Sequence, residues 1–283
     1  MVHRFLKSKS KNRLDIETRA ELMYMCKADA SHTRLPRAMH MHDDRVEIVF
    51  ILEGSGTHIV GGRAYKTKRG DLLVYNSGIL HDESSNPDVD MSVYCCAFKN
   101  LKIKGLAKNC LSREQEGVVF HTRELYPTFE RLLDMLHSQI GVEDRYASEL
   151  CEHLLQALIV LARRLIEDSE SDAESRGYDL GVHIKNYIDQ HYLESIDLKS
   201  MSERLRISPY YLAHKFKSSI GCSPIRYLIR RRIGEAQSLL INTKLSVTEI
   251  ATMVGYDNSN YFNTAFKKIV GITPNSYRKQ STK

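Results

Sequence analysis

Four residues in the first third of the chain have side chains suited to holding a metal ion or a polar ligand. His40 and His42 are separated by one residue, so an extended strand would place both imidazoles on the same side. Glu47 follows five residues later, and His81 lies further along. Such groups coordinate divalent Fe, Mn, Ni or Zn, and they also form hydrogen bonds with organic molecules such as sugars. The residues themselves leave three roles open: metal ligand, lining of an effector pocket, and structural group.

Short β-rich runs separated by turn residues surround these side chains and would position them. The expected strands are Val46–Leu52, Gly56–Val60, Leu72–Tyr75 and Met91–Phe98. Many short strands with glycine-rich turns predict a small antiparallel barrel or sandwich. Tyr75, Tyr94 and Phe50 are candidate walls for a sugar ring, although strand alternation alone does not decide which way they face. Tyr75 joins the four polar residues as an expected effector contact.

From Thr122 the apolar period becomes helical, and it predicts helices over about Leu125–Ile140 and about Tyr146–Ile166. The second helix carries a leucine stripe, which consists of Leu150, Leu154, Leu158, Leu161 and Leu165. This stripe has two interpretations. It packs against its own barrel, or it forms a dimer seam in which two such helices pair as in a short coiled coil.

The last third of the chain contains two copies of one pattern at a single offset. The first copy holds Tyr211, Leu212, Phe216, Lys217, Gly221, Pro224 and Tyr227, and the second holds Tyr261, Phe262, Phe266, Lys267, Gly271, Pro274 and Tyr277. Each copy describes an amphipathic helix that ends at a glycine, and a shorter helix precedes it. A small residue, Ser202 or Ala251, stands where the two helices approach. Helix, tight turn and helix, present twice, is the pattern of a tandem helix-turn-helix.

The charge distribution agrees with a polyanionic partner. The chain has 41 Lys and Arg and 35 Asp and Glu, of which 15 and 4 lie from Lys199 onward. A net charge of +11 in this third leaves −5 for the rest of the chain. The helix expected from Ser223 to about Asn242 spans roughly 30 Å, close to the ~34 Å between successive major-groove faces of B-DNA. One chain could therefore offer two recognition helices to adjacent turns, which favours duplex DNA over RNA.

Residues 182–278 resemble the DNA-binding domain of the AraC/XylS family of bacterial transcriptional regulators. The second copy carries the signature most clearly, from Ser246-Val247-Thr248-Glu249-Ile250-Ala251 through Gly255-Tyr256 and Ser259-Asn260-Tyr261-Phe262 to Phe266-Lys267-Lys268, Gly271, Thr273-Pro274 and Tyr277-Arg278. The first copy departs from it at Arg206, where the second has Gly255, so the first turn is expected to differ slightly in shape.

The exposed N-terminal faces of the two recognition helices are expected to read bases. The expected DNA-binding residues are Tyr210, Ala213, His214 and Lys217 in the first helix and Ser259, Asn260, Asn263, Thr264, Lys267 and Lys268 in the second. The three lysines would lie near phosphate, and Asn260 or Asn263 could read adenine through two hydrogen bonds. Six apolar and aromatic residues are expected in the core instead, namely Tyr211, Leu212, Phe216, Tyr261, Phe262 and Phe266. Arg230, Arg231 and Arg232 would contact the DNA backbone or be solvated.

The histidine region resembles the two cupin motifs, with Gly54, Gly70-Asp71, Gly78 and His81 in place and Asn76 where proline is usual. In metal-bearing cupins the matching three histidines and carboxylate bind a divalent ion, so the candidate metal set is His40, His42, Glu47 and His81. AraC-type regulators commonly bind an organic effector in this barrel without metal. On that resemblance the expected effector is a small molecule, with a sugar as candidate, and no cofactor is expected.

The expected fold is therefore α+β in two domains, a cupin-like barrel with flanking helices followed by an all-α tandem helix-turn-helix. The expected boundaries are a basic arm and lead-in at 1–29, the barrel at 30–120, a helical and dimerisation region at 121–166, a linker at 167–178 and the DNA-binding domain at 179–283. The linker is inferred from a run rich in Ser, Asp and Glu.

Composition narrows the setting. No apolar run approaches the ~20 residues of a membrane span, and six cysteines without metal-type spacing suit a reducing cytoplasm. The expected partners are an operator in double-stranded DNA, the effector, a second copy of the chain and RNA polymerase, without a membrane. The chain is not expected to be an enzyme. The alternatives are a metal-sensing or metal-dependent catalytic cupin joined to a DNA-binding domain, and a non-specific architectural protein.

Overall fold

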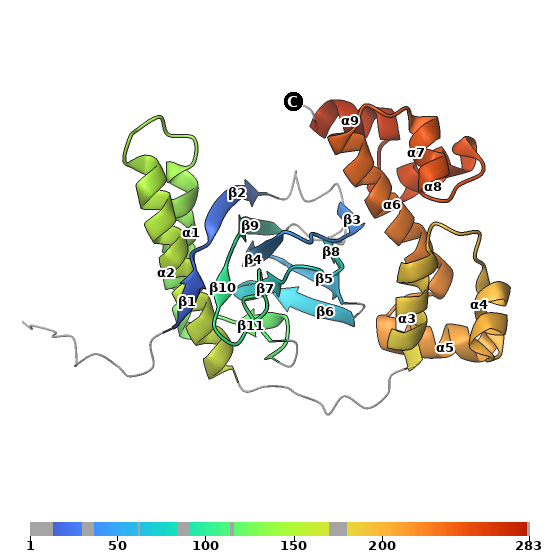
Figure 1. Cartoon of the computed structure of the whole chain (residues 1–283), viewed down its shortest axis with the longest axis horizontal. Coiled ribbons are helices and arrows are strands. Elements are labelled where there is room, and N and C mark those ends of the chain that lie inside the picture. The colour runs from blue at the N-terminus through green and yellow to red at the C-terminus, as the bar shows by residue number, and fades with distance from the viewer. Residues whose placement is uncertain are drawn as a thin grey trace, which may run out of the picture.

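The structure is a computed structural model that describes residues 14–29, 37–61, 63–83, 91–113, 116–169 and 180–281. Its N-terminal part consists of antiparallel strands with two long helices, and its C-terminal part is helical (Figure 1). These are the two domains that the sequence predicts. The expected basic arm and most of the expected linker lie outside the described residues.

A five-stranded antiparallel sheet forms the centre of the N-terminal domain. Its order is β11 (Val119–His121), β7 (Asp71–Tyr75), β4 (Arg45–Glu53), β9 (Ser92–Lys99) and β2 (Glu21–Ala28). Because β2 pairs along its length with β9, the barrel includes residues that the sequence analysis assigned to a lead-in before residue 30. The central strand β4 is buried on both faces, since Ile48 and Phe50 belong to one core and Val49 and Ile51 to another.

A second sheet faces the first and closes the barrel. Its order is β3 (Arg37–His40), β8 (His81–Glu83), β5 (Ser55–Val60) and β6 (Arg63–Lys68). The apolar side chains between the sheets come from both of them, including Val49 and Tyr75 from the first and Val60 from the second. A two-stranded ladder of β1 (Ile16–Thr18) and β10 (Lys102–Ile103) completes the described strands.

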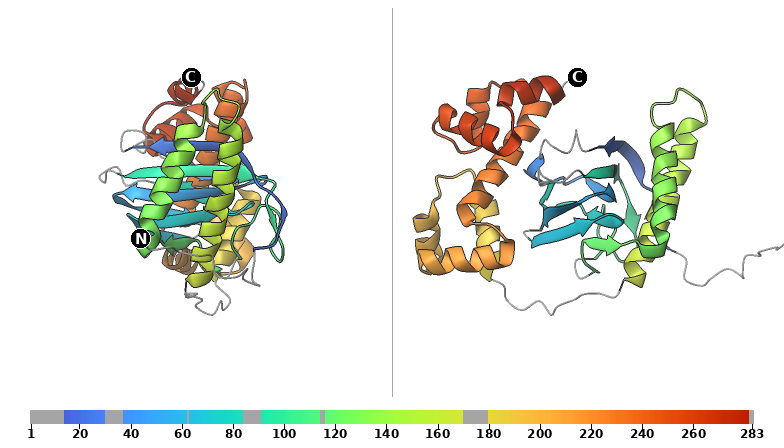
Figure 2. Two further views of the ribbon diagram at one scale, coloured as in Figure 1. Left: turned by 90° about the vertical axis from the view of Figure 1, so that its left-hand side faces the viewer. Right: turned by 180° about the vertical axis from the view of Figure 1, so that it is seen from behind.

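Two helices cover the outer face of the five-stranded sheet. A short 3-10 turn, η2 (Arg123–Leu125), leads into α1 (Tyr126–Gln139), and α2 (Ala147–Asp168) follows it; Figure 2 shows both crossing the strands. Leu154, Leu158 and Leu165 of the leucine stripe are buried in the core beneath them, whereas Leu150 is 40% exposed. Most of the stripe therefore packs against its own barrel. A dimer seam on the remaining surface of α2 stays a prediction.

The C-terminal domain contains two helix-turn-helix units that share one long helix. The helices are α3 (Leu180–His191), α4 (Leu198–Leu205), α5 (Pro209–Ile220), α6 (Pro224–Asn242), α7 (Val247–Met253), α8 (Ser259–Val270) and α9 (Pro274–Ser281). Tyr227 and Leu228 of α6 belong to the core of the first unit, and Ile233 and Leu240 belong to the core of the second. No described helix combines the length and apolar character needed to cross a membrane.

The turns of the two units have the same handedness despite their different residues. Arg206 ends α4 with a φ of 55°, and Gly255 follows α7 with a φ of 87°. Glycine adopts a positive φ without strain, whereas a residue with a Cβ in this region costs about 1–3 kcal/mol. The expected difference in turn shape is thus absorbed as backbone strain at Arg206.

Replacing Arg206 by glycine should relieve this strain. We expect Arg206→Gly to stabilise the helical domain by about 0.5–1 kcal/mol, because the greater backbone entropy of glycine in the unfolded chain offsets part of the gain. Lys215→Gly, an exposed basic residue inside α5, is the matched control and should destabilise by about 1 kcal/mol. Urea unfolding followed by circular dichroism measures both, and a loss of stability in Arg206→Gly would contradict the strain argument.

Candidate effector site and nucleic-acid interface

The three histidines and the glutamate converge on one point inside the barrel. His40 ends β3 and pairs directly with His81 at the start of β8, while Glu47 comes from β4 in the opposite sheet. His42 follows β3, and each of the four offers one ligand atom such that all four atoms lie within 4.8 Å of one another. His40, Glu47 and His81 are buried, with Glu47 only 1% exposed. The expected cluster is therefore present as a compact group.

Backbone carbonyls orient two of the imidazoles. His40 Nδ1 lies 3.1 Å from the carbonyl oxygen of Ala38, and His81 Nδ1 lies 2.9 Å from that of Ile79. A carbonyl only accepts, so each Nδ1 carries the hydrogen. In a neutral ring Nε2 is then the ligand atom, whereas in a protonated ring Nε2 donates towards the cluster. Metal-binding histidines are commonly held in this way, since the second hydrogen bond fixes the tautomer and the ring orientation.

Glu47 supplies negative charge at the centre of the group. Its Oε1 accepts a hydrogen bond from the Cys95 thiol at 2.7 Å, and its Oε2 lies 3.5 Å from Nε2 of both His42 and His81. Burial opposes ionisation, but the contacts with His81 and Cys95 outweigh it and lower the pKa of the Glu47 carboxyl well below its usual range. The group is a carboxylate at neutral pH.

The donor set fits a divalent transition metal. Neither Glu47 Oε2 nor His81 Nε2 forms a hydrogen bond with any described residue, although both atoms are buried. A buried polar atom in that condition costs about 1–3 kcal/mol, and a cation at the convergence point would satisfy both. Three imidazole nitrogens and one carboxylate oxygen suit Fe, Mn, Ni or Zn.

The aromatic residues expected to line the site lie on opposite faces of the five-stranded sheet. Tyr75 lies inside the barrel, where its ring stacks on His81 with centroids 4.1 Å apart. The expectation that Tyr94 and Phe50 could stack on a ligand is wrong, because both face the helices: Tyr94 donates a hydrogen bond to Asp134 on α1, and Phe50 stacks on Phe129. The alternation of β4 places Phe50 opposite to Glu47.

The sequence analysis missed His58 on β5. Its Nδ1 lies 3.2 Å from the Tyr75 hydroxyl, and burial, with a smaller effect of His81, lowers the pKa of His58 to about 4. A neutral His58 therefore forms a hydrogen bond with the Tyr75 hydroxyl and helps to hold that ring beside the cluster. Alternation along β5, which buries His58 and Val60 together, is the signal that could have indicated it.

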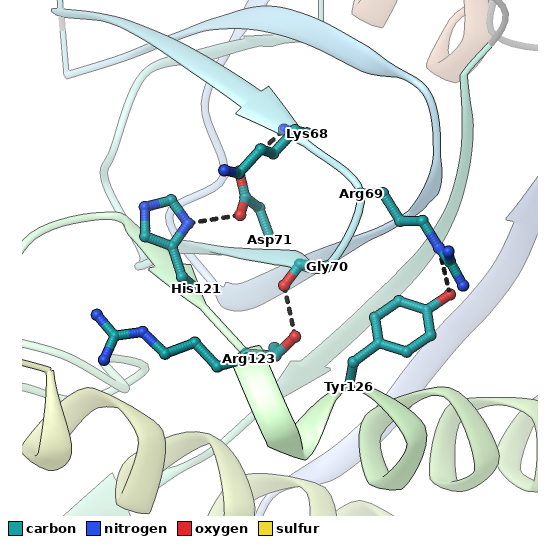
Figure 3. A pocket seen from close by; sticks show the side chains of 8 residues that line it. Lys68, Arg69, Gly70, Asp71, His121, Arg123 and Tyr126 are labelled. Carbon is teal, nitrogen blue, oxygen red and sulfur yellow. Dashed lines mark hydrogen bonds and ion pairs between the residues drawn. The ribbon is translucent and has the colours of Figure 1, made fainter.

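A shallow surface pocket beside α1 is a poorer ligand site. Figure 3 shows that several of its polar groups bond to one another. His121 Nδ1 lies 2.6 Å from Asp71 Oδ1, the backbone N–H of Lys68 donates to Asp71 Oδ2, and the Thr122 hydroxyl donates to the carbonyl of Gly70. These bonds join the barrel to the start of its helical region. The histidine cluster is therefore the stronger candidate for the effector site.

The expected base-reading residues lie on α5 and α8, the second helices of the two units. Tyr210, His214, Asn260 and Thr264 are exposed, Ala213, Ser259 and Asn263 are partly exposed, and the three lysines Lys217, Lys267 and Lys268 are exposed as well. The hydroxyl of Ser208 caps α5, and the side chain of Asn258 caps α8. Both helices thus present polar N-terminal faces that a major groove could accept; their contacts with DNA stay a prediction.

Two further aromatic residues belong to this surface. Tyr211 and Tyr261 were expected in the core, but they are 44% and 59% exposed, whereas Leu212, Phe216, Phe262 and Phe266 are buried as expected. Because the helix needs only one apolar face, the first aromatic of each pair points outward. Their hydroxyls are additional hydrogen-bond donors beside the positions that are expected to read bases.

The three consecutive arginines of α6 form hydrogen bonds and ion pairs within the protein. Arg230 pairs with Asp82, Arg231 pairs with Glu235 and lies over the Tyr192 ring, and Arg232 donates to the carbonyls of Tyr192 and Glu194. The ring distance for Arg231 is 4.1 Å, and the Arg232 bonds are 2.6 Å long. The expectation that these arginines are solvated is therefore wrong, and a contact with the DNA backbone stays a prediction.

Both domains match known families. Residues 201–280 match the helix-turn-helix domain family, and residues 22–159 match the AraC-like ligand binding domain family. The chain is 28% identical over 248 residues to the uncharacterized HTH-type transcriptional regulator YdiP of Escherichia coli (strain K12), covering 85% of this chain and 80% of that protein.

Two further relatives are similar to this chain over most of their length. The arabinose operon regulatory protein of Salmonella typhimurium (strain LT2) is 25% identical over 233 residues, covering 80% of this chain and 81% of the relative. The HTH-type transcriptional activator RhaS of Escherichia coli O6:H1 is 27% identical over 259 residues, covering 88% and 91%. With its ligand-binding barrel followed by a tandem helix-turn-helix, the chain belongs to the AraC/XylS family of DNA-binding transcriptional regulators.

Proposed function

We propose that this regulator responds to a divalent transition metal ion bound by His40, His42, Glu47 and His81. The observation that carries the proposal is the convergence of four ligand atoms within 4.8 Å of one another inside the barrel. The carbonyl-oriented imidazoles and the ionised carboxylate support it, because a ligand set held in its binding geometry loses little entropy when an ion enters. In this proposal the ion is the signal, and the site senses rather than catalyses.

An organic effector is the second candidate. The names of two relatives refer to the arabinose operon and to a Rha activator, which favours a sugar as the effector class here. Tyr75 and the histidines would then serve as hydrogen-bonding groups. The structure weakens this candidate at one point, since His81 covers one face of the Tyr75 ring that would otherwise stack on a sugar.

Removing the charge of Glu47 separates the two candidates. We expect the wild-type protein to bind one Co²⁺ per chain, with visible absorption bands, and Glu47→Gln to weaken that affinity by about 100-fold because the amide keeps the size but not the charge. His153→Gln, an exposed histidine on α2, should bind Co²⁺ as the wild type does. Unchanged affinity in Glu47→Gln, or no Co²⁺ binding by the wild type, would reject the metal proposal. A thermal-shift panel with arabinose and rhamnose would then follow.

The DNA-binding domain would act on an operator through both recognition helices. Two exposed faces joined by one 19-residue helix suit adjacent turns of a single major groove. We further propose that the chain works in the cytoplasm as a homodimer and contacts RNA polymerase when it regulates transcription. All six cysteines, which fall within the described residues, lack a disulfide, as a reducing compartment would require.

Lys267 tests the proposed phosphate contacts. We expect Lys267→Ala to weaken binding to a 30-base-pair duplex of random sequence, and to reduce the slope of log affinity against log salt by about one, since one phosphate contact fewer releases one counterion fewer. Lys108→Ala, an exposed lysine of the N-terminal domain, should leave the slope unchanged. Fluorescence anisotropy over a range of salt concentrations measures both, and an unaltered slope in Lys267→Ala would remove this residue from the DNA contacts.

A further inference from the structure

The edge of the second sheet is covered by the helix that joins the two helix-turn-helix units. Strand β3 is the outermost strand of its sheet, and α6 packs against it (Figure 1). At Gly234 the two backbones approach so closely that an added Cβ would lie 1.8 Å from the carbonyl oxygen of Met39. Only glycine permits this approach. An otherwise exposed sheet edge is thus closed by the DNA-binding domain.

One residue of β3 connects the histidine cluster with α6 through its backbone. The N–H of Ala38 donates to the side-chain oxygen of Gln237 on α6 at 2.8 Å. The carbonyl of the same residue accepts from His40 Nδ1 at 3.1 Å. The orientation of a cluster imidazole and the position of α6 are therefore both tied to Ala38.

The neighbouring strand makes a second connection. His81 and Asp82 are consecutive in β8, so one side chain faces the cluster and the other faces outward. Asp82 is fully buried and pairs with Arg230 of α6, whose Nε and Nη2 lie 2.7 Å and 2.6 Å from Asp82 Oδ2. Two of the four cluster residues thus stand within two positions of the residues that hold α6.

We propose that occupation of the cluster by a divalent metal is coupled to the docking of α6 on β3 and β8, so that the ion stabilises the docked arrangement of the two domains. This inference rests on the proposed function. An ion shared by His40, His81 and Glu47 would tie the edge strand β3 and its neighbour β8 to the central strand β4, and α6 would then meet a fixed surface. Coupling is reciprocal, so docking must strengthen metal binding by the same factor.

Docking does not cover the recognition surface. Tyr210 on α5 and Asn260 on α8 stay exposed while α6 rests against the barrel. The metal would therefore act by fixing where the barrel stands relative to the two reading helices. In a dimer, this position sets how two DNA-binding domains can be spaced along an operator.

Gly234→Ala tests the coupling without altering a cluster residue. Alanine favours a helix more than glycine does, but its methyl group would collide with the Met39 carbonyl and force the domains apart. Both proteins are measured with Zn²⁺ by small-angle X-ray scattering. We expect the full-length variant to have a larger radius of gyration than the wild type. Its Zn²⁺ affinity, measured by competition with a chelator, should fall about tenfold. Ile241→Ala, an exposed position on the same helix, should change neither quantity.

Gln237→Ala provides a second variant, in which the Ala38 N–H loses its acceptor and Zn²⁺ affinity should fall severalfold. An unchanged Zn²⁺ affinity in both variants would overturn the coupling and leave the metal proposal standing. A Gly234→Ala protein as compact as the wild type would also overturn it, since the docking would then not depend on the glycine. Absence of Zn²⁺ binding by the wild type would instead reject the proposed function, and the coupling with it.

Discussion

An ionised carboxylate at the centre of a buried strand is the constraint from which the arrangement of this protein follows. Glu47 stands in β4 between residues that are all buried, and β4 is bonded on both sides. A charge in such a place is tolerated only when other groups compensate for it. The compensating imidazoles are His40 at the end of β3, His42 two residues later and His81 in β8, so the charge is balanced across the two sheets. The outer edge of that second sheet is in turn the surface on which α6 rests.

The alternation of apolar residues predicts where the strands of the barrel lie, but it does not predict which way their side chains face. Both faces of β4 are apolar, so alternation shows two faces without showing which one lies under the helices. Phe50 and Tyr94 were candidates for the ligand site on this account, and the helices α1 and α2 decide the question by covering that face. The cluster itself was predictable because the sequence contains only one set of alternating histidines with a nearby glutamate. His58 was not, since its role depends on the distant Tyr75.

The repeat in the last third was predictable for a different reason. Two copies at one offset reinforce each other, and their glycines and apolar positions set the ends and cores of the helices. The repeat could not show which of its aromatic residues lie outside the helical core. A recognition helix buries one face, and the aromatic pair of each copy spans two directions, so Tyr211 and Tyr261 emerge at the surface. The contacts between the domains left no signal in either copy, because Gly234, Gln237 and Arg230 lie between them.

The charge of the C-terminal third therefore has two uses that composition alone cannot separate. The run of three arginines on α6 lies in the most basic part of the chain, yet these side chains bond to Asp82, to Glu235 and to backbone carbonyls. A buried guanidinium that bonds to fixed acceptors positions helices. The exposed lysines of α5 and α8 are the charges that we propose face a polyanion. Because Arg230 reaches into the barrel while its neighbours brace the helical domain, α6 links the effector domain to both reading helices. A regulator built this way can transmit a change at its barrel to both reading helices through one helix.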